Sequence, residues 1–271
     1  MEVQLRSRDE HSIILGSSPL PTFVTACWQS TKTSLAVTIL VLLGVGSTSF
    51  CQSQAVFEAR FQPENLTEEQ LIYRVISGNV AIGELITSIV HDAGGVITLN
   101  ETTTGLYTQT TMIVVRDDAT LQPLRSATTI PSEVRDQLVK VRYDYPQVRG
   151  HLDVPVAFGG TREVRTKLQD IRQDWYLIPY LLRASQLALR NYFAFPVYHP
   201  LTDSKIMARG WVMRIENVQV PAGEFECFRI DGYSGRQRWI IYLQTAFPQR
   251  LIKRVLPGLG VEYQLFSVQR R

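Results

Sequence analysis

The sequence has few of the residues that most often build catalytic and metal sites. It contains four histidines and three cysteines among 271 residues. It has no His-Glu-x-x-His, Cys-x-x-Cys or His-x-His motif, no Gly-x-Ser-x-Gly nucleophile elbow and no phosphate-binding glycine loop. We therefore expect no metal, no cofactor and no enzymatic activity.

A concentrated basic region is also missing. The formal net charge is only +3, and lysine and arginine are scattered along the chain. Because nucleic acid binding needs a concentrated basic footprint, we expect no nucleic acid partner. A group of cations near the C-terminus could meet an anionic headgroup, although a solvated outer face of a sheet is the simpler interpretation. These cations are Arg236, Arg238, Arg250, Lys253 and Arg254.

One strongly apolar run, residues 35–45, follows Lys32 and precedes small residues. A basic flank, an apolar core and a small-residue exit are typical of a secretory signal peptide, here with cleavage after Ala55. An uncleaved anchor over residues 33–50 and a lipoprotein modified at Cys51 are the alternatives. We expect export to the periplasm or cell envelope, with the membrane contacted only through this segment.

The rest of the chain is expected to form one domain, since it shows no internal repeat and no linker. We assign residues 1–55 to an N-terminal extension with the signal peptide, 56–69 to a tether and 70–271 to a single antiparallel β domain. Export would leave Cys227 without a disulfide partner. Its strand-like surroundings predict a buried packing residue.

Two runs of alternating apolar residues meet at the turn Val220-Pro221-Ala222-Gly223. Pro221 fits the first turn position, and Gly223 can adopt a positive φ, so the pattern predicts an antiparallel hairpin. Similar short runs separated by turn residues recur from Leu71 to Val268. Many short strands at such spacing are typical of an antiparallel barrel or sandwich.

One helix is predicted, over about residues 176–188. Apolar residues recur at positions 178, 181, 182, 188 and 189, and Pro179 is tolerated in a first turn. A helix this apolar must be buried against the sheet. The predicted fold is therefore mainly β: a curved antiparallel sheet, an open or partial barrel, with one helix packed on its concave side.

Three segments resemble an exported bacterial family of unknown function: Tyr73–Gly83, Ile178–Arg183, and Val218–Phe225 followed by Trp239. The resemblance covers about residues 70–268, and its most specific part is the Val-Pro-Ala-Gly-x-Phe turn. It implies a barrel-forming cell-envelope protein, similar in architecture to periplasmic lipoprotein carriers, in which a curved sheet wraps a helix and offers an apolar cavity. No catalytic residue accompanies the resemblance.

We expect an apolar or amphipathic ligand, such as a lipid, between sheet and helix. A curved sheet closed only by a helix can leave a cavity, and large apolar side chains would line it. The predicted lining residues are Trp175, Tyr176, Leu177, Leu181, Leu182, Trp211 and Trp239.

Two alternatives remain. If these side chains fill the interior completely, the protein is a structural or scaffolding component of the envelope. Less favoured is a hydrolase that uses carboxylates such as Asp144, Asp153 or Glu226, because the sequence does not give their relative positions.

Overall fold

The computed structural model describes residues 61–105, 108–131, 138–144, 149–153, 161–165, 173–199 and 204–270. These residues belong to one compact unit, Gln52–Arg271. The predicted signal or anchor segment lies outside them. Among the helices of the described ranges, none is long and apolar enough to cross a membrane.

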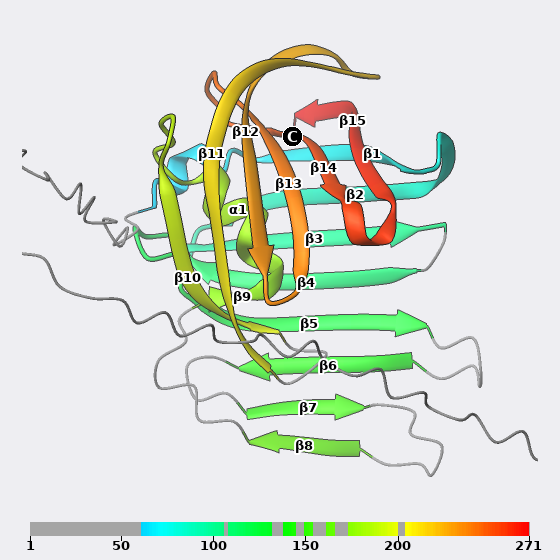
Figure 1. Ribbon diagram of the computed structural model, residues 1–271. Coiled ribbons are helices and arrows are strands. Elements are labelled where there is room, and N and C mark those ends of the chain that lie inside the picture. The colour runs from blue at the N-terminus through cyan, green and yellow to red at the C-terminus, as the bar shows by residue number, and fades with distance from the viewer. Residues whose placement is uncertain are drawn as a thin grey trace, which may run out of the picture. The chain divides into compact units, whose positions relative to one another are not determined.

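Strands dominate the described residues (Figure 1). The strands are β1 (Glu69–Ser77), β2 (Val80–Asp92), β3 (Val96–Thr104), β4 (Gln109–Arg116), β5 (Pro123–Pro131), β6 (Leu138–Asp144), β7 (Arg149–Asp153), β8 (Thr161–Arg165), β9 (Gln173–Asp174), β10 (Tyr192–His199), β11 (Ser204–Val220), β12 (Gly223–Ser234), β13 (Gln237–Gln244), β14 (Leu251–Leu256) and β15 (Val261–Arg270). The helix is α1 (Ile178–Arg183), and short 3-10 turns are η1 (Pro63–Asn65), η2 (Trp175–Leu177) and η4 (Pro257–Leu259).

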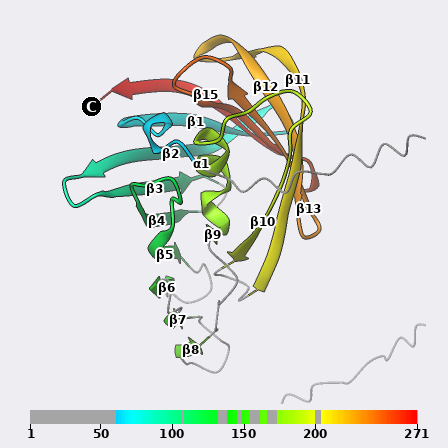
Figure 2. The same cartoon turned by 90° about the vertical axis from the view of Figure 1, so that its left-hand side faces the viewer.

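All these strands lie in one sheet, in the order β8-β7-β6-β5-β4-β3-β2-β1-β15-β14-β13-β12-β11-β10-β9. Neighbours are antiparallel except β10 and β9, which are parallel. The sheet curls so far that β9 returns toward β5: the Gln173 side chain donates a 3.0 Å hydrogen bond to the Thr120 carbonyl, just before β5. The strands from β5 round to β9 thus form a nearly closed barrel, and β6–β8 extend its β5 edge (Figure 2). The predicted fold class is confirmed.

The predicted hairpin is present. Val220 pairs with Gly223, which leaves Pro221 and Ala222 as a two-residue turn between β11 and β12. Gly223 has a φ of 135°, a conformation that an L side chain rarely adopts. The turn chemistry therefore fixed both the position and the register of the longest hairpin.

The helical segment is shorter than predicted. The Asp174 side chain caps η2 by accepting a 2.8 Å hydrogen bond from the Tyr176 amide, and α1 ends at Arg183. The predicted extension to residue 188 is wrong, because the Ala188 amide donates to the Asn191 side chain instead of to a helix carbonyl. Leu189, counted as part of the helix stripe, is 51% exposed in a loop.

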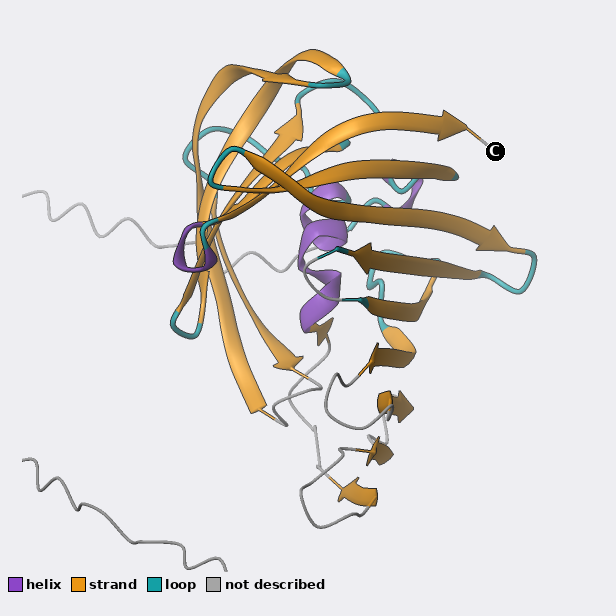
Figure 3. Ribbon diagram, turned by 90° about the vertical axis from the view of Figure 1, so that its right-hand side faces the viewer, coloured by secondary structure: helices purple, strands orange, loops and turns teal. Residues whose placement is uncertain are grey.

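Helix α1 is buried on two sides, between the two walls of the curled sheet (Figure 3). Leu177, Tyr180 and Leu181 pack into a cluster with the β2–β4 wall. Ile178 and Leu182 pack into a second cluster with β1 and the β10–β15 wall. A helix that is apolar all round requires such a doubly covered position. The predicted placement on the concave side is confirmed.

Part of the predicted tether belongs to the folded unit. Phe61 and Leu66 are buried in the β2–β4 cluster, and the Gln62 amide donates a 2.7 Å hydrogen bond to the Ala184 carbonyl beyond the helix. The predicted start of the domain at residue 70 is therefore too late. The polar composition of this stretch gave no indication that Phe61 and Leu66 are buried. Residues 56–60 lie outside the described ranges.

Cys227 is a buried packing residue, as predicted. Burial, assisted by the nearby carboxylates of Glu216 and Glu226, raises the pKa of its thiol to about 12. The thiol therefore stays protonated at neutral pH and is a poor nucleophile.

Candidate functional site

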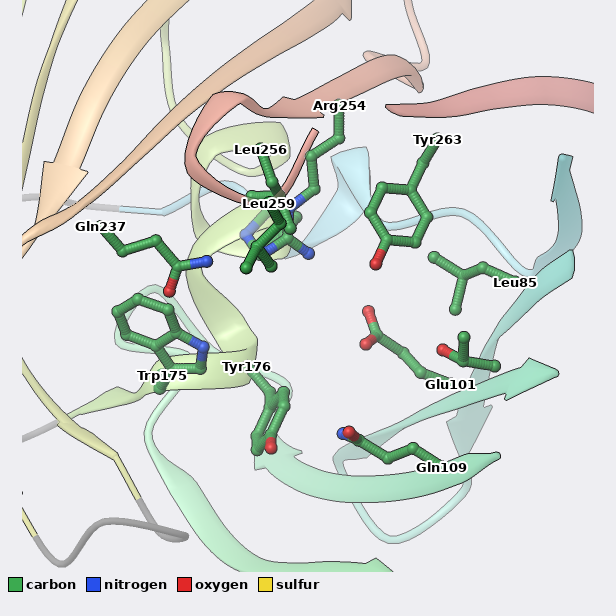
Figure 4. A pocket seen from close by; sticks show the side chains of 12 residues that line it. Leu85, Glu101, Gln109, Trp175, Tyr176, Gln237, Arg254, Leu256, Leu259 and Tyr263 are labelled. Atoms are coloured by element: carbon green, nitrogen blue, oxygen red, sulfur yellow. The ribbon is translucent and has the colours of Figure 1, made fainter. Parts of the chain in front are cut away.

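A cavity of about 140 Å³ lies beside the start of the helical segment, between the two walls of the sheet (Figure 4). Its lining comes from β2, β3, β4, η2, α1, β13, β14, η4 and β15. The apolar lining residues are Leu85, Trp175, Pro179, Leu256 and Leu259; the polar ones are Glu101, Thr103, Gln109, Tyr176, Gln237, Arg254 and Tyr263. The cavity is therefore amphipathic rather than purely apolar.

The carboxyl group of Glu101 points into this cavity (Figure 4). Its Oε1 accepts a 2.9 Å hydrogen bond from the Tyr180 hydroxyl on α1. Loss of water around the carboxyl raises the pKa of Glu101, and this effect outweighs the opposing positive charge of Arg254. The carboxyl group can therefore stay protonated above its ordinary pKa, and in that form it donates a hydrogen bond.

Arg254 supplies the positive charge of the cavity. Its guanidinium group stands 5.7 Å from the ring centre of Tyr263, in a cation–π arrangement. Its Nε atom is buried and has no hydrogen-bond partner among the described residues. A buried N–H that lacks a partner costs free energy, so this atom can bind an acceptor that enters the cavity.

Two tyrosines beside Glu101 also have perturbed pKa values. Burial raises the pKa of Tyr180 well above its ordinary value, and the adjacent Glu101 carboxyl adds to the effect. Burial raises the pKa of Tyr176 as well, with the charge of Asp174 as the next cause. Such clusters are more frequent at binding and catalytic sites than elsewhere.

The predicted lining residues separate into different environments. Trp175 and Tyr176 do line the cavity. Leu177, Leu181 and Leu182 do not: they fill the two apolar clusters on either side of the helix. The space that was expected to hold an apolar ligand is therefore occupied by the protein's own side chains.

The two predicted strand tryptophans lie on opposite faces of the sheet. Trp239 is 2% exposed, and its Nε1 donates a 2.9 Å hydrogen bond to Ser234 Oγ inside the core. Trp211 is 36% exposed and packs against Tyr192, with 5.0 Å between ring centres. Trp211 thus cannot line the interior. The inner side of β11 consists of smaller residues, Ala208, Gly210 and Val212.

The polar residues of the cavity were missed in the sequence, although a usable signal was present. Glu101 follows Ile97 and Leu99 at period two, which places it on the buried face of β3. Arg254 stands in the same way between Ile252 and Leu256 on β14. A charged residue inside an inward apolar stripe is the pattern that could have identified both.

The five C-terminal cations do not form one anionic-headgroup surface. Arg254 faces the cavity, Arg250 Nε contacts Glu69 Oε2 at 2.7 Å, and Lys253 Nζ contacts Glu262 Oε2 at 2.6 Å. Arg238 lies on the outer face, bonded to Asp231 at 3.1 Å. Their proximity in sequence was therefore misleading.

Comparison with known proteins identifies a family for most of the folded unit. The sequence profile of the family described as "Protein of unknown function (DUF3108)" matches residues 72–254. The chain belongs to the DUF3108 family. None of the curated proteins matches it. The chain is also similar to a crystal structure of a protein from Bacteroides fragilis that is predicted to be exported and has a YmcC-like fold. The sequence identity is 11% and the TM-score is 0.30, and the match covers 78% of this chain and 100% of that one.

In this DUF3108 chain one carboxylate of the hydrolase alternative, Glu226, lies far from the other two in the strand order. Asp144 and Asp153 lie in β6 and β7, at register positions opposite Arg149 and Lys140. Glu226 lies in β12, far along the strand order, and accepts a 2.7 Å hydrogen bond from Thr245. Within the described residues, no three histidine, cysteine, aspartate or glutamate side chains form a group that could hold a metal ion.

Glu101→Gln should change how the stability of this DUF3108 domain depends on pH. The folded state raises the pKa of Glu101, so the stabilising contribution of its neutral form is lost as pH rises through the folded pKa. The amide never ionises, and the variant should gain stability relative to the native chain as pH increases. Urea unfolding between pH 4 and pH 8 measures this difference, and a difference that does not vary with pH would contradict it.

Proposed function

We propose that this protein is an exported cell-envelope component that binds a small amphipathic ligand in the cavity around Glu101 and Arg254. The observation that carries the proposal is the buried Nε of Arg254, which has no partner among the described residues and belongs to a side chain that lines the cavity. An amphipathic ligand is favoured because polar and apolar side chains line one space.

The donors of the cavity indicate which chemical group the ligand presents. Arg254 offers an N–H, and protonated Glu101 offers an O–H, so a ligand oxygen that accepts both is favoured. A carbonyl or carboxyl group at the end of a short apolar chain fits this requirement. Leu85, Leu256 and Leu259 would contact the apolar part.

The volume of the cavity limits the size of the ligand. Typical small-molecule sites measure about 300–1,000 Å³, and this cavity is about 140 Å³. A whole phospholipid would not fit, whereas the end of an acyl chain or its carboxyl group would. The occupied clusters around α1 favour the alternative, a scaffolding protein without a ligand, and the same experiment separates the two.

Export rests on the sequence of the N-terminal region, where Lys32 precedes the apolar run of residues 35–45. No catalytic role is proposed, because Glu226 lies far from Asp144 and Asp153 in the strand order. Glu101 accepts its hydrogen bond from Tyr180, and the nearby carboxylate of Asp174 affects its pKa less than burial, Arg254 and Tyr180 do. Acid–base work on a glycosidic bond needs two carboxyl groups about 5–10 Å apart.

Native mass spectrometry of the full-length gene product, purified from the envelope of its own cells, tests both parts of the proposal. We expect a polypeptide mass that begins near Val56, together with a small adduct that is released by organic solvent. Arg254→Gln should reduce adduct occupancy at least tenfold, because a hydrogen bond to a charged group contributes about 1.5–3 kcal/mol.

Arg238→Gln is the matched control, since Arg238 makes its ion pair on the outer face. It should retain the adduct. A native chain that carries no adduct would leave the scaffolding alternative, and an adduct that survives Arg254→Gln would place the ligand elsewhere. An intact N-terminus on protein from the cytoplasm would contradict export.

A further inference from the structure

The outer face of β11 and β12 exposes large apolar side chains. Met207, Trp211 and Met213 lie on the same side of β11, where Arg209 stands between the first two. Tyr233 on β12 pairs directly with Arg209. Each of these four side chains is at least one-third exposed. Because α1 lies on the other side of this wall (Figure 2), none of them contributes to the core.

The opposite arrangement, in which the large side chains of β11 and β12 face inward, is excluded by packing. On the inner side, a Cβ at Gly210 would come within 2.6 Å of the Phe193 ring, and a Cβ at Gly232 within 2.1 Å of the Trp239 ring. Small residues are therefore required at the inward-facing positions 210 and 232. No such packing requirement places Trp211 or Met213 on the outside, where leaving them exposed costs solubility.

The exposed residues border an open hollow of about 590 Å³. It is lined by Lys205, Ile206, Met207, Arg209, Trp211 and Tyr233, with Gly235 at the turn. Two of these side chains are cations, and no acidic residue of the described ranges lines the hollow. Arg209 makes no ion pair with any described residue, so its charge is available to a partner.

The acidic residue nearest in register is already neutralised. Asp231 stands opposite Trp211 and is held by Arg229 at 2.8 Å and by Arg238 at 3.1 Å. These two guanidinium groups lower the pKa of Asp231 against the effect of its burial. The charge that this part of the face presents is therefore positive.

We propose that this outer face, which we name the Trp211 face, binds the surface of an anionic phospholipid membrane. Tryptophan and tyrosine place an apolar ring and a polar tip at the level of lipid headgroups. Arginine and lysine bury their apolar stems while their charged ends meet phosphates. The Trp211 face combines both on one wall of the sheet. It is separate from the cavity, so this inference does not depend on the proposed ligand.

Vesicle sedimentation of the full-length protein tests this proposal. Vesicles of phosphatidylcholine with one-third phosphatidylglycerol should bind the protein at least about tenfold more tightly than pure phosphatidylcholine, and salt should reduce the difference. Trp211→Ser combined with Arg209→Gln should remove at least about fivefold of the affinity, which corresponds to loss of a single cation at an anionic surface. Any vesicle binding through the N-terminal apolar run is the same in the native protein and in the double variant.

The matched control is Phe247→Ser with Arg116→Gln, two exposed residues outside the Trp211 face. This variant should bind as the native chain does. Brominated lipids should quench tryptophan fluorescence in the native protein, and Trp211→Phe should lose the part of the quenching that does not come from Trp28 beside the N-terminal apolar run. Equal binding by the Trp211 variant and the control overturns the proposal. So does a native dimer that Trp211→Ser dissociates without any vesicle binding, which would identify a second copy as the partner.

Discussion

Glu69→Gln should lower the free energy of unfolding by about 3–5 kcal/mol, the typical cost of removing one member of a buried ion pair. Glu69 is 1% exposed at the start of β1. Its Oε1 contacts Arg183 and its Oε2 contacts Arg250, both at 2.7 Å. Without the carboxylate, the guanidinium of Arg183 would stay buried with no counter-charge.

These contacts explain why the effect should be global rather than local. Arg183 is the last residue of α1, and its Nε also donates a 3.0 Å hydrogen bond to the Gln249 carbonyl just before β14. One carboxylate thus joins the helix to both β1 and the segment leading into β14. Loss of the triad would release the end of the helix from β1 and from the segment leading into β14 at the same time.

Urea unfolding of Glu69→Gln and of Glu216→Gln forms a matched comparison. Glu216 makes a 2.6 Å contact with Arg214 at the surface, where such a pair contributes at most about 1 kcal/mol. A loss at Glu69 no larger than the loss at Glu216 would show that the buried triad does not stabilise the fold. Replacing Glu69, Arg183 and Arg250 together by apolar residues should recover much of the loss.

The fold was predictable because local chemistry and long-range pairing agree in most of the chain. The turn at Pro221-Ala222 fixed one hairpin. Gly83 marks both a bulge and a close backbone approach, the two uses typical of a glycine inside a strand: the β1–β2 register shifts beside it, and a Cβ at this position would lie 1.9 Å from the Thr104 carbonyl oxygen.

The site was much less predictable, because its position depends on which side of each strand faces inward. Period two gives two alternating sets but does not say which of them is buried. On β11, Trp211 was expected to line the interior, whereas Ala208, Gly210 and Val212 occupy it. The Phe193 ring from β10 lies against Gly210, and the Trp239 ring from β13 lies against its register partner Gly232. Only knowledge of those neighbouring rings could have decided the question.

The surroundings of the helix were also not predictable from its own sequence. Leu181 and Leu182 were expected to line a hollow, but the sheet curls around α1 and covers both sides of it. How far a sheet curls depends on the sum of twist and bulges over many strands, and no local sequence window contains that sum. The cavity therefore lies beside the start of the helical segment rather than along it.

Trp239→Ala should be the most destabilising change in the β10–β15 wall, by about 3–5 kcal/mol, while Trp211→Ala should cost no more than about 0.5 kcal/mol. The Trp239 ring stacks on Phe193 with 6.2 Å between ring centres, and its N–H bonds to Ser234. Its removal leaves a cavity and an unpaired hydroxyl. Trp211, in contrast, contacts only Tyr192 among the described rings.

A double-mutant cycle with Gly232 tests the packing directly. Gly232→Ala alone should cost about 1–3 kcal/mol, because its Cβ would lie 2.1 Å from the Trp239 ring. In the Trp239→Ala background that ring is absent, so the same substitution should cost little, and the two losses should not add. Additive losses in urea unfolding would mean that the Trp239 ring does not lie against Gly232. A small loss for Trp239→Ala would mean that the tryptophan borders open space, as a residue lining a ligand cavity would.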